Sequence, residues 1–331
     1  MLEVAVNDNV IRIGARFAVS LQRTLRIPDD GRGYPLPPGL GAFPIFNVSN
    51  YSAFLPATWN KQDSVFIPMY QREALWLGFN AAGWKPNAVQ VAIGGINAIS
   101  GEHEDVGLHQ DPQNYVVCPP QLWLDGINSG DGLIRQFVAV PLGSGYTAEA
   151  ALTGAETVGG IQIKVFEPKP GRFPDQPPPE KSHPQCFASP GSAMGLGAGG
   201  TMRQKIYADP YGVDTWDEAN YGGITIHIIN SAQFKEITGT SPPPSPIDAH
   251  SYTKYGLPWF ELYDDSIPAI QGAKPLVQIK TISDRDRERG MTDVSNHSVD
   301  IGESQIQELR EKESRGVEKP FPPSNSKSTS P

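Results

Sequence analysis

Glycine and proline interrupt this chain too often for long helices to form. The 331 residues contain 34 glycines and 32 prolines. Proline removes a helical hydrogen bond and clashes with the preceding turn, so this frequency excludes a helical bundle and a TIM barrel. Hydrophobic residues still make up 38% of the chain, which is enough to bury a core. A folded protein built mainly from strands and turns is therefore expected.

Apolar and polar residues alternate from Phe17 to Ile27, and the run ends at the turn sequence 28–31. Such alternation places every second side chain on one face of a strand. Similar runs occur at residues 66–79, 88–93, 115–118, 133–140, 160–166, 203–207, 223–229, 258–263 and 275–282. Together they predict roughly ten to twelve strands and an all-β fold, either a sandwich or barrel-like.

Few segments predict helices, and all of them are short. Residues 146–152 form one candidate, with Thr147 placed to cap the helix and Gly154 to end it. Residues 231–239 and 248–255 form two more, each with a glycine at its end. These helices are expected to connect strands.

The segment 167–200 is rich in proline and glycine and poor in apolar residues, which predicts a loop or linker. Two arrangements are open: one β-rich domain over residues 1–283, or two lobes, 1–166 and 201–283, joined by this segment. The single domain is favoured because the strands after residue 200 are too few to close a core of their own. Residues 284–331 are polar and of mixed charge, and they predict a disordered tail.

The charge balance excludes two classes of partner. A net charge of −9 leaves no basic surface for nucleic acid or for an anionic membrane. The sequence has no run of 18 apolar residues and no signal-like N-terminus, and its two cysteines, Cys118 and Cys186, are too few for a disulfide framework. A soluble protein of the cytoplasm is expected.

One segment has the order of elements that can hold an anion. A predicted strand, a Gly-Ser-Gly loop and a helix start follow one another between residues 137 and 147, and backbone N–H groups in such a loop can bind negative charge. The candidate residues are Gly143, Ser144, Gly145 and Thr147, with Arg135 as a charge partner. The alternative, an ordinary strand-to-helix turn, is favoured.

An acidic loop at residues 102–111 contains two histidines among carboxylates. The candidate metal ligands are His103, Glu104, His109 and Asp111, which would make the protein a metal-dependent hydrolase. The spacing matches no zinc or calcium motif, so a solvated acidic loop is favoured.

A tryptophan stands among acidic residues near position 216. Asp214, Trp216, Asp217 and Tyr221 could together bind a carbohydrate or another small ligand, because sugar sites combine aromatic faces with carboxylates. The alternative, an aromatic side chain that anchors a surface loop, is favoured.

Covalent catalysis has little support in the sequence. Cys118 lies in an apolar setting, which raises a thiol pKa, and Cys186 lies in the proline-rich segment. The Ser, His and Asp residues show no spacing typical of a catalytic triad. We therefore expect no cofactor and lean toward a protein that is not an enzyme.

Four strings in the sequence are distinctive as a set. They are WLDGI at 123–127, IRQFVAVPLGSGYT at 134–147, LTG at 152–154 and GLGAGGTMRQKI at 195–206. In these strings the chain resembles a family of uncharacterised bacterial and fungal β-rich proteins, over residues 10–265. The family has no known activity, so the resemblance implies a grouping and no mechanism.

These observations predict a non-enzymatic β-rich protein that acts through surface contacts. It would be a self-associating structural protein or a binding module, with another protein or a second copy as its partner. A carbohydrate- or small-ligand-binding β-sandwich is one alternative. The metal-dependent hydrolase is the other.

Overall fold

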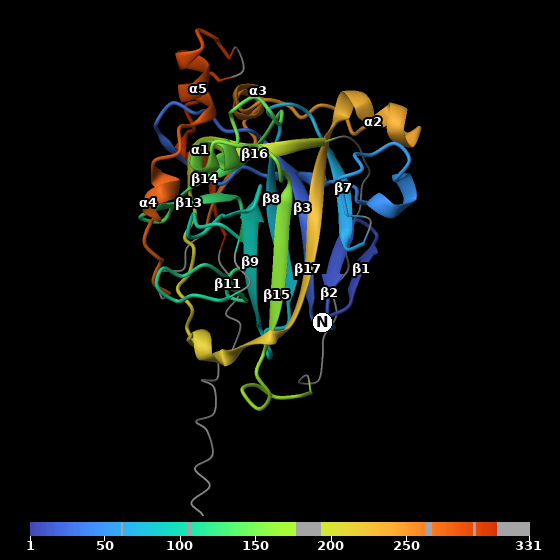
Figure 1. Ribbon diagram of the computed structural model, residues 1–331. Helices are drawn as coiled ribbons and strands as arrows, with labels where there is room; N and C mark the ends of the chain where they lie inside the picture. Colours follow the sequence, from blue (N-terminus) through green and yellow to red (C-terminus); the bar gives the residue numbers. More distant parts are fainter. Residues whose placement is uncertain (61, 105–106, 177–192, 263–266, 294–295, 310–331) are drawn as a thin grey trace, which may run out of the picture.

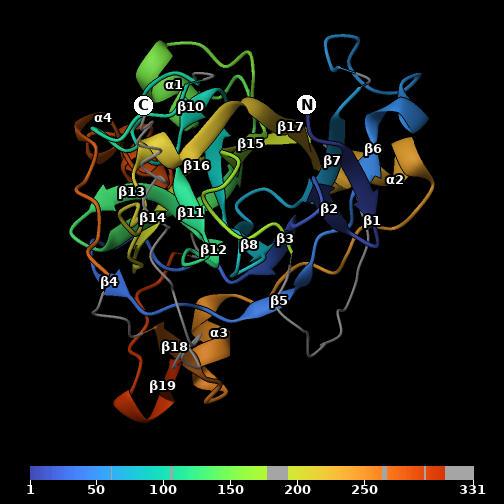
Figure 2. The same cartoon turned by 90° about the horizontal axis from the view of Figure 1, so that it is seen from below.

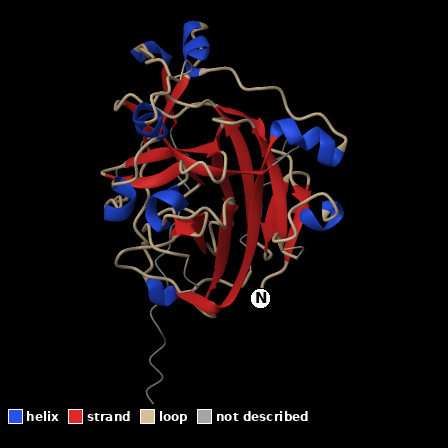
Figure 3. Ribbon diagram, turned by 45° about the horizontal axis from the view of Figure 1, so that its top comes forward, coloured by secondary structure: helices blue, strands red, loops and turns tan. Residues whose placement is uncertain are grey.

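The computed structural model describes residues 1–309, except for residues 61, 105–106, 177–192, 263–266 and 294–295. Strands dominate the described residues, and the helices are short and lie around the edges of the sheet (Figure 3). The predicted all-β fold with a few short helices is thus confirmed. Among the described residues, no helix combines the length and the apolar character needed to cross a membrane.

The strands form two groups that share one strand, β16. The first group is β1 (Val4–Asn7), β2 (Val10–Ile13), β3 (Phe17–Thr24), β8 (Ala74–Ala81), β14 (Leu133–Val140), β16 (Ala193–Arg203) and β4 (Gly33–Tyr34), in that order across the sheet. Shorter strands add to its members: β5 (Gly39–Ala42) to β3, β12 (Trp123–Leu124) to β8, and β13 (Gly126–Gly130) to β14. All these pairs are antiparallel except β16 with β4.

The second group has the order β6 (Phe46–Asn47), β7 (Ser64–Met69), β17 (Trp216–Asn230), β15 (Ile161–Pro168) and β9 (Asn87–Ile93). Two short strands, β10 (Ile96–Asn97) and β11 (Val116–Cys118), pair with β9. Strand β16 joins the groups, because Ala193 and Met194 pair with β17 while the residues from Gly195 onward pair with β14.

The helices are α1 (Ala148–Thr153), α2 (Ser231–Thr238), α3 (Ala249–Lys254), α4 (Lys274–Val277) and α5 (Ile282–Glu288), with 3₁₀ turns at η1 (Val48–Tyr51), η2 (Val213–Thr215) and η3 (Glu303–Gln305). A separate parallel ribbon of β18 (Trp259–Leu262) and β19 (Ile306–Leu309) lies beside α3 (Figure 2). The three predicted helices are α1, α2 and α3. Thr147 caps α1, and Gly154 ends it in the left-handed conformation, as predicted.

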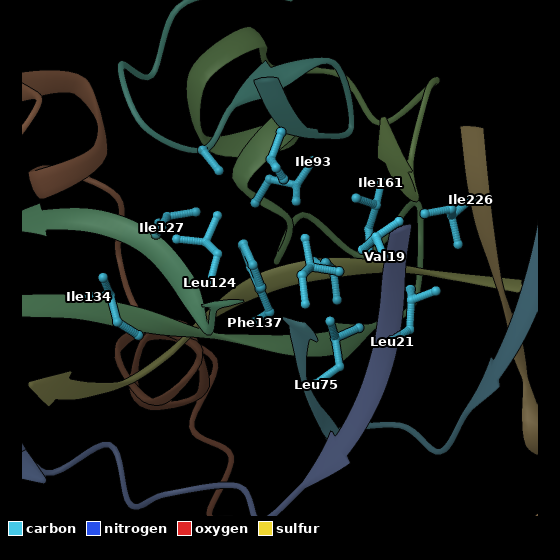
Figure 4. Packing of buried hydrophobic residues seen from close by; sticks show 14 of the residues in the cluster. Val19, Leu21, Leu75, Ile93, Leu124, Ile127, Ile134, Phe137, Ile161 and Ile226 are labelled. Atoms are coloured by element: carbon cyan, nitrogen blue, oxygen red, sulfur yellow. The ribbon is translucent and has the colours of Figure 1, made fainter. Parts of the chain in front are cut away.

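The core lies between the two strand groups. In Figure 4, Val19 and Leu21 of β3 lie close to Ile161 of β15 and Ile226 of β17, and all four belong to one buried hydrophobic cluster. Full burial of each such side chain contributes about 1.5–3 kcal/mol to stability. The apolar residues of the alternating pattern therefore form the core, and both strand groups contribute to it.

The strands after residue 200 do not form a lobe of their own. Strand β17 pairs with β15 and β7, and β16 pairs with β14, so late and early strands alternate within one sheet. The two-lobe arrangement is therefore wrong for the described residues. The few strands after residue 200 need no core of their own, because they pair with strands from the first half of the chain.

The predicted loop at 167–200 contains most of a strand. Residues 193–200 belong to β16, and β15 continues to Pro168, while residues 177–192 lie outside the described part. The glycines of β16 allow close approach: a Cβ on Gly199 would lie 2.5 Å from Val138 Cγ2, and one on Gly200 would lie 2.2 Å from the Pro28 carbonyl oxygen. Glycine is here a packing requirement rather than a sign of a loop.

The predicted boundary of the tail is also wrong, because residues 284–309 include most of α5 and the whole of β19. Val299 is buried, with 4% of its surface exposed. The run 275–282, predicted as a strand, instead forms α4 and the start of α5, where Thr281 and Asp284 make a capping box. The rest of the predicted tail, residues 310–331, lies outside the described part.

Candidate functional site

The predicted anion loop does bind a carboxylate, but one from its own chain. Glu156 accepts hydrogen bonds from the backbone N–H groups of Gly145 (2.9 Å) and Thr147 (3.2 Å) and from the Thr147 hydroxyl (2.6 Å). Partial burial alone would raise the pKa of Glu156, but these bonds, with one from the Gly143 N–H, hold that pKa below its usual value. The donors predicted for an external anion are thus used to fix the loop.

Arg135 does not belong to this loop. Its guanidinium donates to the carbonyl oxygen of Ile279. Burial lowers the pKa of Arg135, and the nearby carboxylates of Asp29 and Asp284 oppose that effect. Arg135 therefore holds the segment before α5 against β14, and its prediction as the charge partner of the anion loop is wrong.

The predicted metal ligands are not assembled. Glu104 makes an ion pair with Lys164 at 2.8 Å, and the His109 backbone N–H donates to the Asn114 side chain. His103 pairs with Ile96 in an isolated β-bridge, and Asp111 is exposed. Within the described residues, which omit 105–106 of this loop, no three His, Cys, Asp or Glu side chains are grouped to hold a metal ion. These contacts agree better with the favoured alternative, an acidic surface loop, than with a metal site.

Trp216 does not offer a face to a sugar. Only 1% of its surface is exposed, and it packs in a cluster with Tyr115 and Phe166. Its indole N–H donates to Asp209 Oδ2 at 2.9 Å. Tyr221 packs against Phe166, while Asp214 is exposed and Asp217 is half-buried. The predicted ligand site at Trp216 is therefore wrong, and the aromatic side chain anchors the loop instead.

A pocket lies where three segments of the chain meet: the turn between β7 and β8, the loop between β14 and α1, and the residues after α5. Figure 1 places α1 and α5 at the same end of the sheet. The pocket encloses about 210 Å³ and is lined by Gln71, Arg72, Val140, Pro141, Ser144, Tyr146, Arg289 and Met291. This volume is below that of drug-sized sites, so the pocket suits a small ligand.

Arg72 is held rigidly at one wall of the pocket. Its backbone has φ of +69°, a left-handed conformation that costs about 1–2 kcal/mol for a residue with a Cβ. The guanidinium makes two bonds to Asp286, at 2.7 and 2.8 Å, and one to Asp293 at 3.0 Å. Hydrogen bonding to Asp286 raises the pKa of Arg72. The strained turn and the paired carboxylates fix this cation in place.

Tyr146 connects the two arginines of the pocket. The Arg289 guanidinium lies 4.4 Å from the centre of its ring and that of Arg72 lies 5.8 Å away. Its hydroxyl donates to Asp286 Oδ1 at 2.8 Å. Burial, followed by the bond to Asp286, raises the pKa of Tyr146, so the phenol stays protonated at neutral pH.

Arg289 differs from Arg72 in its partners. It is exposed, and its Nη2 donates to the Ser144 carbonyl oxygen at 2.6 Å. Within the described residues it makes no ion pair with a carboxylate, whereas Arg72 makes two. A guanidinium has five N–H donors, and within the described residues Arg289 uses one nitrogen, in the bond to Ser144. This is the group best placed to receive an anion.

The sequence interpretation missed most of this site. The sequence predicts a disordered tail at Arg289 and Met291, and it places Gln71 and Arg72 in the middle of a strand over residues 66–79. Of the pocket residues, the predicted sites include only Ser144. No local pattern marks these positions, because the pocket forms where distant segments meet.

No protein-family model, curated protein or solved structure matches this chain. The resemblance to bacterial and fungal β-rich proteins stays a prediction. The function must be argued from the geometry of the pocket.

Proposed function

We propose that this is a non-enzymatic binding protein whose pocket takes a small molecule with a carboxylate or phosphate group beside an apolar part. The observation that carries this proposal is Arg289, a guanidinium stacked on Tyr146 at the edge of a pocket of about 210 Å³. Arginine donors match the geometry of carboxylate and phosphate oxygens.

The charges around the pocket favour an anion. Three arginines, Arg26, Arg72 and Arg289, lie near two aspartates, Asp286 and Asp293, which bind the first two of them. Glu156 binds the same loop as Arg289, but its carboxylate accepts from Gly145 and Thr147. Arg289 is thus the one of the three arginines that makes no ion pair within the described residues, so an anion can pair with it.

The other walls favour an apolar group on the ligand. Val140 and Pro141 line the pocket from β14 and the loop after it, and Met291, which has 54% of its surface exposed, lines it from the opposite segment. Methionine adapts its shape to an apolar or aromatic ligand. A small aromatic or aliphatic anion would therefore use both kinds of wall.

The polar groups of the pocket support binding rather than catalysis. The Tyr146 hydroxyl donates to Asp286, and the Ser144 hydroxyl donates to the Pro141 carbonyl oxygen. The Ser144 hydroxyl is bonded to a carbonyl oxygen, which is not a base. The Asp286 carboxylate that accepts from Tyr146 is a weak base, because, although burial acts in the opposite direction, its bonds to Arg72 hold the pKa of Asp286 below its usual value. These side chains position a ligand and hold the walls together.

Titration calorimetry of the full chain at low salt tests the proposal, with phenyl phosphate, benzoate and inorganic phosphate as probes. We expect phenyl phosphate or benzoate to bind more tightly than inorganic phosphate. Replacing Arg289 by Gln should weaken that binding about 10-fold or more, because a charge-assisted hydrogen bond contributes about 1.5–3 kcal/mol.

Arg287→Gln is the matched control, because Arg287 is an exposed arginine of α5 that pairs with Asp284 away from the pocket. It should change the affinity less than twofold. Failure of all three probes to bind the unaltered chain, or an equal loss in both variants, would contradict the proposal. Self-association, the other surface function predicted from the sequence, stays a prediction that light scattering can test.

A further inference from the structure

The segment from Ile282 to Asp293, called the strap below, is attached to the rest of the molecule mainly by charge. Asp286 binds Arg72 through both carboxylate oxygens, and Asp293 bridges Arg72 and Arg26. Their partners, Arg72 in the turn before β8 and Arg26 in the chain after β3, are more than 200 positions away in sequence. These ion pairs fix the strap across the end of the sheet.

Apolar contacts contribute little to this attachment. Within the strap, Ile282 is buried in a small cluster with Ala74, Val138, Val140 and Tyr146. Residues 287–292 are exposed, and Met291 is among them. Segments with few buried apolar contacts open at lower free energy than the core. The strap should therefore detach without global unfolding, and more readily as salt screens its ion pairs.

The pocket exists only while the strap is attached. The strap supplies Arg289 and Met291, and the body of the protein supplies the remaining lining residues. When the strap detaches, one wall of the pocket and the Arg289 guanidinium leave together. A ligand that fills the pocket therefore has contacts with the attached state that the detached state cannot offer.

We propose that occupation of the pocket by a small anion and attachment of the strap are coupled, so that the ligand locks the strap down and a loosened strap weakens the ligand. This inference rests on the proposed function. The coupling is reciprocal by thermodynamic necessity. A ligand present at 100 times its Kd should lower the population of the detached strap about 100-fold.

Hydrogen exchange of the full chain tests the coupling, with phenyl phosphate as the probe. Without ligand, amides of the strap should exchange faster than those of β14, which shows opening below global unfolding. Added phenyl phosphate should slow exchange in the strap in proportion to its concentration and leave β14 unchanged.

Two variants separate attachment from ligand contact. Asp293→Asn removes an anchor that does not line the pocket and leaves both bonds between Arg72 and Asp286 in place. It should speed exchange in the strap and weaken phenyl phosphate binding by a similar factor. Asp300→Asn removes an exposed partner of Arg32 outside the strap and should change neither quantity.

The outcomes distinguish the two proposals. If phenyl phosphate binds while exchange in the strap is unaffected, the coupling is wrong and the binding function stands. If Asp293→Asn loosens the strap and the affinity does not fall, the coupling is again wrong. If the strap exchanges only as fast as β14, there is no separate opening to couple. If no probe binds, both proposals are wrong.

Discussion

At the scale of single residues, burial makes the charged form of a carboxylate costly. Asp125 shows this most clearly: its carboxylate accepts a bond from the Gln204 side chain at 2.6 Å, and its backbone N–H donates back to Gln204. Burial raises the pKa of Asp125 to about 7, although bonds from Gln204 and Trp123 act in the opposite direction. The charged form of this carboxylate therefore lowers the stability of the folded protein.

We expect Asp125→Asn to stabilise the protein at pH 8 and to have little effect at pH 4. The folded pKa of about 7 lies above the unfolded value near 3.9, so the folded state binds the extra proton and stability is lost as pH rises between those values. The amide carries no charge and escapes this loss, which is on the order of a few kcal/mol.

Urea unfolding at both pH values measures this difference. Asp214→Asn is the control, because Asp214 is exposed, and its effect should be small at either pH. An effect of Asp125→Asn that is the same at pH 4 and pH 8, or a loss of stability at pH 8, would show that Asp125 is not the group that titrates.

At the scale of elements, β16 shows how composition can mislead. Its glycines lie where neighbouring backbone and side chains leave no space for a Cβ. We expect Gly200→Ala to destabilise the fold by about 1–3 kcal/mol or more, because the new methyl group would lie 2.2 Å from a backbone oxygen that cannot move aside easily.

Thermal unfolding of the variant tests this expectation. Gly223→Ala in β17 is the matched control, since a Cβ there would meet its nearest atoms at 3.4 and 3.5 Å. The control should melt close to the unaltered protein. Equal melting temperatures for the two variants would mean that β16 does not pack as described.

At the scale of the whole molecule, residues late in the chain are held against the segment that follows β3. The Asn296 side chain accepts from the backbone N–H of Asp29 at 2.7 Å, and Arg26 pairs with Asp293. The charge pattern that predicted a disordered tail is also what attaches α5 and Asp293, because arginines of the body face their aspartates.

A chain that ends after Ser283 should therefore be less stable than the full chain by about 3 kcal/mol or more. The deletion leaves Arg26, whose side chain is 10% exposed, without its carboxylate, and breaking a buried pair costs about that much. Urea unfolding measures the loss. Asp300→Asn, which removes an exposed pair, should cost less than about 1 kcal/mol. Unchanged stability after truncation would instead support the prediction of a disordered tail from residue 284.

The sequence by itself determined the strand-rich class, the strands whose residues alternate, such as β3 and β15, and the ends of α1, because alternation and capping depend on near neighbours. Only the tertiary structure decided that β16 is a strand, that α5 and β19 extend the fold beyond Ser283, and that Arg72 and Arg289 share a pocket. These features depend on partners such as Arg26 and Asp293, which are 267 positions apart. Local patterns carry no information about which distant charge or backbone atom will arrive beside a residue.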